Sequence, residues 1–355
     1  DADIILLAVK PQIMQEVLLG IAPHVKSNAL VISVAAGVTI GTIEAVLGVE
    51  AHVCRAMPNT PAIVGAAATA LAVGAHVSAA GGANKAIARA EEIGAECFQI
   101  FASSPRMWLS KPIEDAVVNK YESEMKRARM GPTVLHGKYL VALGSDDPQL
   151  LAKSENALQT DIAAANKLGA LGVIFHPASH RGQGFAAVVD RFAGSVCKIL
   201  DSERGNSLLM LETSAGSGDH IGSKFEELGT LIRAIGDARV AVCLDTQHVW
   251  AAGYDITSVD ALNATIEEFD REIGLGLLKS VHANDSMREL GSSVDRHENI
   301  GDGLIGIEGF ETLMSHEVFQ NVPFYLEVPG TGKSGPDKPN VDRLKSIRAN
   351  VGARR

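Results

Sequence analysis

The sequence contains few cysteines and no long hydrophobic run. Its four cysteines, Cys54, Cys97, Cys197 and Cys243, are far apart and form no Cys-x-x-Cys pair. This spacing argues against a disulfide framework or a thiolate zinc site, and it favours a reducing, cytoplasmic location. The longest apolar stretch, residues 62–77, is interrupted by glycine and histidine. It does not reach the ~18–20 apolar residues that a membrane helix needs, so we expect no association with a membrane.

Basic residues are outnumbered by acidic ones. The 32 Lys and Arg against 42 Asp and Glu give a net charge of −10, which argues against non-specific coating of nucleic acid but allows a local basic groove. Hydrophobic residues make up 46% and charged residues 21% of the 355 positions, as in folded proteins, which excludes extensive disorder. The chain begins with Asp rather than Met, and a strand-like segment follows, so we expect a truncated N-terminus.

Strand-like and helix-like segments alternate along the chain, which predicts an α/β fold. In the first 71 residues we expect strands at 3–9, 29–34 and 51–56, with helices at 11–21 and 39–47. Later strands are expected at residues 73–78, 97–102, 133–137, 172–177, 207–213, 240–248, 278–285 and 324–329. Eight strand–helix repeats match a (β/α)8 TIM barrel, whereas an open doubly wound sheet fits about five or six strands. We therefore predict a partial Rossmann-like segment at 1–71 and a TIM barrel at 72–355.

Metal-binding residue types lie at the ends of six consecutive predicted barrel strands and in the loops beside them. These residues are His136, His176, Glu212, Asp245, His248, His282, Asp295, His297 and Glu327. A single histidine at a strand end is usually a hydrogen-bonded structural residue, but the carboxyl ends of all strands of a TIM barrel meet at one face. So many polar groups there would be costly unless metal ions bind them. Five histidines and four carboxylates without a thiolate suit zinc, and also manganese or iron.

Nine such ligands are too many for one ion. With three or four ligands each and one bridging carboxylate, they would serve about three divalent ions. Three divalent ions would carry a total charge of about +6 and the four carboxylates a charge of −4, so the net charge of the centre would be positive. A positive centre favours a phosphodiester and its charged transition state.

From about residue 73 to the C-terminus, the sequence resembles endonuclease IV, a zinc-dependent apurinic/apyrimidinic endonuclease. The stretches that carry the resemblance are GAHVSAAGG (74–82), FQIFASSPRMW (98–108), HGKYL (136–140), FHPASH (175–180), LETSAGSG (211–218), CLDTQHVWAAGYD (243–255), HANDS (282–286), VDRHENIGDG (294–303) and LEVPG (326–330). The resemblance implies a monomeric hydrolase that cleaves double-stranded DNA 5′ to abasic sites in base excision repair. It also implies three zinc ions per chain, with manganese as an alternative at some sites.

The resemblance further assigns roles to single residues. One zinc would be bound by His136, His176 and Glu212, a second by Glu212, Asp245, His282 and Glu327, and a third by His248, Asp295 and His297. Glu212 would be catalytic, because it would bridge the two ions that flank the attacking hydroxide. Arg106, Tyr139 and Leu140 would push into the DNA stack where the base is missing. The alternatives are ordinary loop packing for Tyr139 and Leu140 and a solvated charge for Arg106, and His76, His180 and Asn284 are candidates for orienting ligands or for structural roles.

The first 71 residues resemble a different family. AVKPQ (8–12), VISVAAGVTI (31–40) and RAMPNTPAIVGAAATAL (55–71) are similar to pyrroline-5-carboxylate reductase. No strand with a Gly-rich turn precedes them, so the pyrophosphate of a dinucleotide would have no helix N-terminus to bind. We expect no cofactor-binding residues and no reductase activity in this fragment.

Two other functions stay open at this point. A sugar isomerase or epimerase of the xylose isomerase-like kind would use a related barrel, but with one or two ions it would leave His248, Asp295 and His297 without a role. Alternatively, the reductase fragment would define the protein as a chimera with an oxidoreductase or non-catalytic role.

Overall fold

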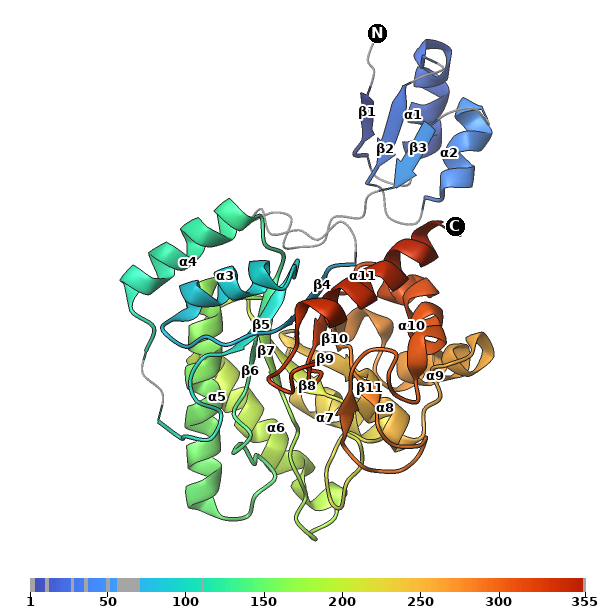
Figure 1. Cartoon of the computed structure of the whole chain (residues 1–355). Coiled ribbons are helices and arrows are strands. Elements are labelled where there is room, and N and C mark those ends of the chain that lie inside the picture. The colour runs from blue at the N-terminus through green and yellow to red at the C-terminus, as the bar shows by residue number, and fades with distance from the viewer. Residues whose placement is uncertain are drawn as a thin grey trace. The chain divides into compact units, whose positions relative to one another are not determined.

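The computed structural model describes residues 4–9, 13–26, 29–34, 38–48, 52–55, 71–109 and 112–353. The chain forms two compact units, Asp1–Ala70 and Leu71–Arg355, which are described separately (Figure 1). Within the described residues, every helix is too short or too polar to cross a membrane.

The N-terminal unit contains a small parallel sheet in the order β1 (Ile4–Leu7), β2 (Leu30–Ser33) and β3 (His52–Arg55). Its helices are α1 (Met14–Ile21), the 3-10 helix η2 (Ala22–His24) and α2 (Ile40–Leu47). The Thr39 hydroxyl accepts a hydrogen bond from the Thr42 amide at 3.1 Å and so caps α2. A core of six buried side chains packs the helices against the sheet: Leu7, Met14, Leu18, Val31, Val38 and Ile43. The likeness to half of a Rossmann domain stays a prediction, and residues 56–70 of its third motif lie outside the described residues.

The second unit is a closed barrel of eight parallel strands, as predicted. In their order around the barrel the strands are β10 (Leu278–His282), β13 (Phe324–Leu326), β4 (Val73–His76), β5 (Phe98–Phe101), β6 (Thr133–His136), β7 (Gly172–Phe175), β8 (Leu208–Glu212) and β9 (Val240–Asp245). Pairing of β9 with β10 closes the circle. Strands β6, β7 and β9 are buried along their whole length, as expected when both faces of a parallel sheet are covered.

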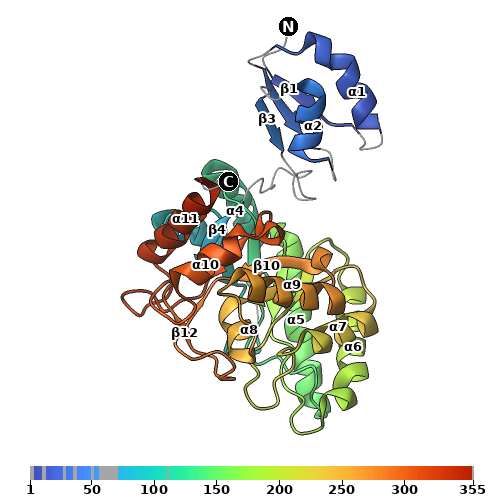
Figure 2. The ribbon, with the colours of Figure 1, turned by 90° about the vertical axis from the view of Figure 1, so that its right-hand side faces the viewer.

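Helices form a ring outside the strands (Figures 1 and 2). The helices are α3 (Ala83–Glu92), α4 (Asp115–Ala128), α5 (Pro148–Leu168), α6 (Phe185–Ser202), α7 (Phe225–Ile235), α8 (Thr246–Ala252), α9 (Val259–Glu272), α10 (Gly306–Ser315) and α11 (Lys338–Ala353). Short 3-10 helices lie at Leu275–Leu277 (η4) and Glu317–Phe319 (η5). The last helix is tied to the first strand region, because Arg348 donates to the Leu71 carbonyl at 2.6 Å and pairs with Glu96.

All eight predicted barrel strands end one to three residues earlier than expected, and two of these ends bear on the site. The strand predicted at 240–248 stops at Asp245, where α8 begins, because the Asp245 side chain accepts a hydrogen bond from the His248 amide at 2.9 Å and caps the helix. The strand predicted at 278–285 stops at His282, and a short antiparallel pair follows, β11 (Asp285–Ser286) with β12 (His297–Glu298). Both corrections place side chains at the carboxyl-terminal rim of the barrel.

Candidate metal centre

The rim of the barrel brings the nine predicted ligand residues to one face. His136, Glu212, Asp245 and His282 are the last residues of β6, β8, β9 and β10, and His176 and Glu327 directly follow β7 and β13. The other three come from adjoining segments: His248 from α8, His297 from β12 and Asp295 from the loop before β12. Ligand atoms of eight of them form three groups in which all atoms lie within 4.8 Å of one another.

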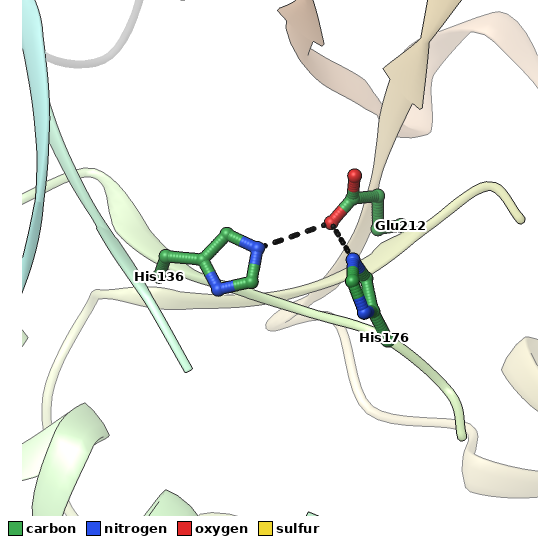
Figure 3. Close-up of side chains that lie close together, drawn as sticks. All are labelled: His136, His176 and Glu212. Atoms are coloured by element: carbon green, nitrogen blue, oxygen red, sulfur yellow. Dashed lines mark ion pairs between the residues drawn. The ribbon is translucent and has the colours of Figure 1, made fainter. Parts of the chain in front are cut away.

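The first group joins three neighbouring strands. The Nε2 atoms of His136 and His176 lie 3.3 and 3.0 Å from Oε2 of Glu212, as Figure 3 shows. His136 and Glu212 are buried, whereas the side chain of His176 is 43% exposed. One side of this group is therefore open to solvent.

The second group shares Glu212 with the first. Nδ1 of His282 lies 2.9 Å from Oε1 of Glu212, 3.3 Å from Oε2 of Glu327 and 3.8 Å from Oδ2 of Asp245. Each carboxylate oxygen of Glu212 thus faces a different group, which is the geometry a bridging ligand requires. The resemblance to endonuclease IV implies the same shared position for Glu212.

The third group departs from the prediction in one respect. The atoms that converge belong to Asp245, His248 and His297, so Asp245 is common to the second and third groups. Asp295 lies beside them, with its oxygens 3.4 Å from Nε2 of His248 and 3.4 Å from Nε2 of His297. Its side chain is 51% exposed. The sequence could not show that Asp245 faces both groups, because this depends on where β9 ends.

Hydrogen bonds fix the ring orientation of three of the histidines. Nδ1 faces a backbone carbonyl oxygen in His136 (Gly137, 2.7 Å), His248 (Thr213, 2.8 Å) and His297 (Glu327, 3.3 Å). A nitrogen that donates to a carbonyl carries the proton, so the lone pair of a neutral ring is on Nε2, toward the cluster. This arrangement is typical of metal-binding histidines.

The charges of the cluster also call for a cation. Burial alone would lower the pKa of His248. The carboxylates of Asp245, Asp295 and Glu212 outweigh burial and raise this pKa to about 10. Although burial acts in the opposite direction, neighbouring His176 and His282 hold the pKa of Glu212 well below its usual range. Glu212 is therefore ionised, and the negative charge around His248 attracts either a proton or a metal ion to its imidazole.

Two buried atoms of the centre lack a hydrogen-bond partner among the described residues: Oε2 of Glu212 and Nε2 of His297. Leaving such atoms unsatisfied is costly. Both lie where the groups converge, so a bound cation would satisfy them. The donor set, its overlap and these two atoms together fit divalent metal ions of the zinc type.

A groove of about 510 Å³ runs beside the centre. Its lining includes Tyr139, Leu140, His176, His248 and Asp295. The Tyr139 side chain is 55% exposed, and its ring lies 5.7 Å from that of His136, edge to face. Arg106 is also exposed, in the turn after β5. The structure therefore places Tyr139 and Leu140 at the edge of the metal centre.

Sequence reasoning missed two polar residues near the centre. Gln99 is fully buried on β5 and contacts His282 and Glu327. Lys138 points into the protein and pairs with buried Asp161 at 2.9 Å, so it is not available to a ligand. A polar residue within the apolar strand segment FQIF was a signal that could have identified Gln99.

The candidate Asn284 does contact two of the nine residues, donating to Asp245 at 2.7 Å and accepting from the Glu327 amide at 2.8 Å.

Comparisons with known proteins agree with the fold of the barrel. The family model of the xylose isomerase-like TIM barrel matches residues 87–349. The chain is 37% identical over 276 residues to the probable endonuclease 4 of Chloroflexus aurantiacus, which covers 77% of this chain and 97% of that protein. It is 38% identical over 277 residues to the probable endonuclease 4 of Halothermothrix orenii, covering 78% and 99%.

Solved structures give the same result. The crystal structure of endonuclease IV from Thermus thermophilus superposes with a TM-score of 0.69 at 33% identity, over 79% of this chain and 99% of that chain. A D-tagatose 3-epimerase-like protein superposes with a TM-score of 0.61 over 80% and 99%, but at 17% identity it shows the shared fold alone. The chain therefore belongs to the endonuclease IV family of hydrolases, built on the xylose isomerase-like TIM barrel.

Proposed function

We propose that this chain is a metal-dependent endonuclease that cleaves double-stranded DNA on the 5′ side of abasic sites, leaving a 3′-hydroxyl and a 5′-deoxyribose phosphate. The observation that carries the proposal is the convergence of nine histidine and carboxylate side chains in overlapping groups at one face of the barrel. The relatives named endonuclease 4 support the reaction class. In this proposal the protein acts in base excision repair.

The groups would hold three divalent ions per chain, zinc or, at some sites, manganese. The first site would be His136, His176 and Glu212, the second Glu212, Asp245, His282 and Glu327, and the third His248, Asp295 and His297 with Asp245 shared. When bound, such ions lower the pKa of water and offset the negative charge of a phosphodiester and its transition state. The protein supplies ligand atoms whose orientation is set in advance, because the opposite ring nitrogen donates a hydrogen bond to a backbone carbonyl.

Glu212 has the central part in this proposal. Its two oxygens face the first and second groups, and its side chain is fully buried. It would therefore set the spacing between two sites, while the exposed side of His176 leaves a path for the phosphate. We assign Glu212 as the catalytic residue on this basis.

Recognition of the damage would occur at the groove. Tyr139 and Leu140 follow His136 by three and four residues and line the groove beside the centre. An aromatic and an aliphatic side chain can fill the space of a missing base, which avoids part of the cost of unstacking a normal pair. The exposed Arg106 would contact the opened strand. Arg106 and the bound metal ions would make the surface at the groove locally positive despite the net charge of −10 of the whole chain.

A sugar isomerase or epimerase is the second candidate, because proteins of that kind share the fold. Such a reaction would use one or two ions. It would leave the third group, with His248, His297 and Asp295, without a role. The third group therefore favours the endonuclease.

A metal-loaded incision assay tests the proposal. Two duplexes of one sequence, one with a single abasic site and one intact, are incubated with the zinc-loaded protein, and the product ends are mapped. We expect cleavage of the abasic duplex alone, one bond 5′ to the lesion, and loss of cleavage after chelation. No cleavage, or equal cleavage of both duplexes, would contradict the proposal, and epimerisation of a ketose would favour the alternative.

We further propose that the protein acts as a cytoplasmic monomer and that residues 72–355 are the catalytic domain. All nine proposed ligands lie at or beyond His136. We assign no cofactor-binding role to residues 1–71. Sedimentation of the purified chain, alone and with DNA, tests the monomer.

A further inference from the structure

Gln99 occupies an unusual position for an amide side chain. It is the second residue of β5, in a segment whose other members are Phe98, Ile100 and Phe101, and it is 0% exposed. A buried amide has two donors and one acceptor oxygen to satisfy. In Gln99 all three meet partners at the metal centre.

The partners of Gln99 fix which way its amide points. Nε2 lies 2.5 Å from Oε1 of Glu327 and 2.9 Å from Nδ1 of His76, and Oε1 lies 2.8 Å from Nε2 of His282. A carboxylate that binds a metal ion has only acceptor oxygens to offer, and Oε1 of Glu327 is the atom that faces the amide. The opposite amide orientation would place two acceptor oxygens against each other. The amide nitrogen therefore donates to Glu327, and the amide oxygen accepts from His282.

This orientation determines where His282 carries its proton. Because Nε2 donates to Gln99, the lone pair of the neutral ring is on Nδ1. Nδ1 is the atom that faces Glu212, Glu327 and Asp245 at 2.9, 3.3 and 3.8 Å. A lone pair aimed at three carboxylates is unfavourable unless a cation lies between them.

The amide oxygen of Gln99 accepts a hydrogen bond from the ring of His282. Backbone carbonyls accept the corresponding hydrogen bonds from His136, His248 and His297. Gln99 differs in being a side chain, so its contribution can be removed without moving the backbone. It also holds a second member of the same group, because its N–H donates to Glu327. A single amide thus orients two of the four residues in the second group.

We propose that Gln99 is a positioning residue for the second metal site, which directs Nδ1 of His282 and the Glu327 carboxylate toward the bound ion. The proposal rests on the proposed metal centre. When the hydrogen-bonding partner of a metal ligand is removed, the metal affinity typically falls by about 10–100-fold. The first and third groups do not include either residue that Gln99 holds, so their affinity should be preserved.

The test compares Gln99→Met, which keeps length and bulk without polar groups, with Gln99→Glu, which keeps only the acceptor. Tyr121→Phe is the matched control, because it removes a buried hydrogen bond to Thr133 at 2.7 Å, at the opposite end of β6 from the metal centre. Zinc per chain is measured over a series of buffered free zinc concentrations, together with the His282 ring N–H signal by NMR in the zinc-loaded proteins.

We expect Gln99→Met to retain two zinc ions as tightly as the parent chain and to bind the third at least tenfold more weakly. The Nε2–H signal of His282 should be lost by exchange in Gln99→Met but persist in Gln99→Glu and in Tyr121→Phe. If Gln99→Met does not fold, loss of the signal in Gln99→Glu would overturn the proposal. A parent chain that binds three zinc ions and a Gln99→Met variant with unchanged affinities would also overturn it, whereas a parent chain that binds no zinc would refute the metal centre itself.

Discussion

The two units of this chain use parallel strands in very different ways. In the N-terminal unit the sheet has three strands, and Ile4 and Leu6 on β1 are each 62% exposed. In the barrel the eight strands close on themselves, and all six residues of β9 are buried. Closure removes the sheet edges and brings every strand end to a common rim.

The two units also differ in where candidate metal-binding groups lie. Among the described residues, every cluster able to hold a metal ion lies at the barrel rim. Six strands contribute ligands there, which an open sheet of three strands cannot do. The barrel is therefore the part of the chain in which substitutions should alter activity, and the following predictions test that division.

The largest effect is expected for Glu212→Gln. An amide keeps the shape of the side chain but removes the charge that faces the two groups sharing Glu212. We expect incision of the abasic duplex to fall by more than about a hundredfold, with a much smaller change in DNA affinity, because the groove is unaltered. Single-turnover kinetics and a binding titration measure the two quantities, and turnover near that of the parent chain would exclude the bridging role.

Metal removal should change how stability depends on pH. In the metal-free protein the pKa of His248 is raised to about 10 from 6.5. A raised pKa stabilises the fold fully below the unfolded value, and this stabilisation is lost as pH rises through the folded value. The melting temperature of metal-free protein should therefore fall between about pH 7 and pH 10.

The melting temperature of the zinc-loaded protein should instead rise with pH over the lower part of this pH range. Zinc displaces the protons on the imidazoles, so its affinity rises with pH and binding releases protons. Calorimetry in two buffers of different ionisation enthalpy counts the released protons at neutral pH. Zinc binding without proton release would contradict the assignment of His248 and its neighbours as ligands.

A smaller effect is expected when the proposed recognition residues are removed. Tyr139→Ala together with Leu140→Ala should weaken binding to the abasic duplex by about 1–3 kcal/mol, the value of stacking one base on an aromatic ring. Affinity for the intact duplex should change little. Arg106→Ala should act in the same direction and lower the salt dependence of binding. Equal losses on both duplexes, measured at two salt concentrations, would show that these residues only pack the loop or contact the backbone.

Much of this architecture could be predicted from the sequence. The barrel followed from eight strand segments, six of the nine residues at the rim followed from their positions at strand ends, and the other three from the adjoining loops. The exact end of β9 could not be predicted, because it depends on the cap that Asp245 forms on α8. The contact of Gln99 with Glu327 also could not, since it joins residues 228 positions apart.

The smallest effect is expected on removal of the N-terminal unit. A chain that starts at Leu71 keeps the bond from Arg348 to the Leu71 carbonyl, whereas one that starts at residue 73 loses it and also the Ala72 carbonyl that pairs with Phe324. We expect incision by the first variant to be within about twofold of that of the full chain, and a lower melting temperature for the second. Loss of soluble protein in the first variant would show that the barrel depends on residues 1–70.

The number of zinc ions per chain tests the central claim most directly. Metal-free protein is reconstituted with zinc, freed of loosely bound ions, and analysed by mass spectrometry for zinc and protein together with its incision rate. The overlapping groups at Glu212 and Asp245 predict about three ions per chain, with incision appearing only as the sites fill. A fully active protein that holds a single ion would contradict the account.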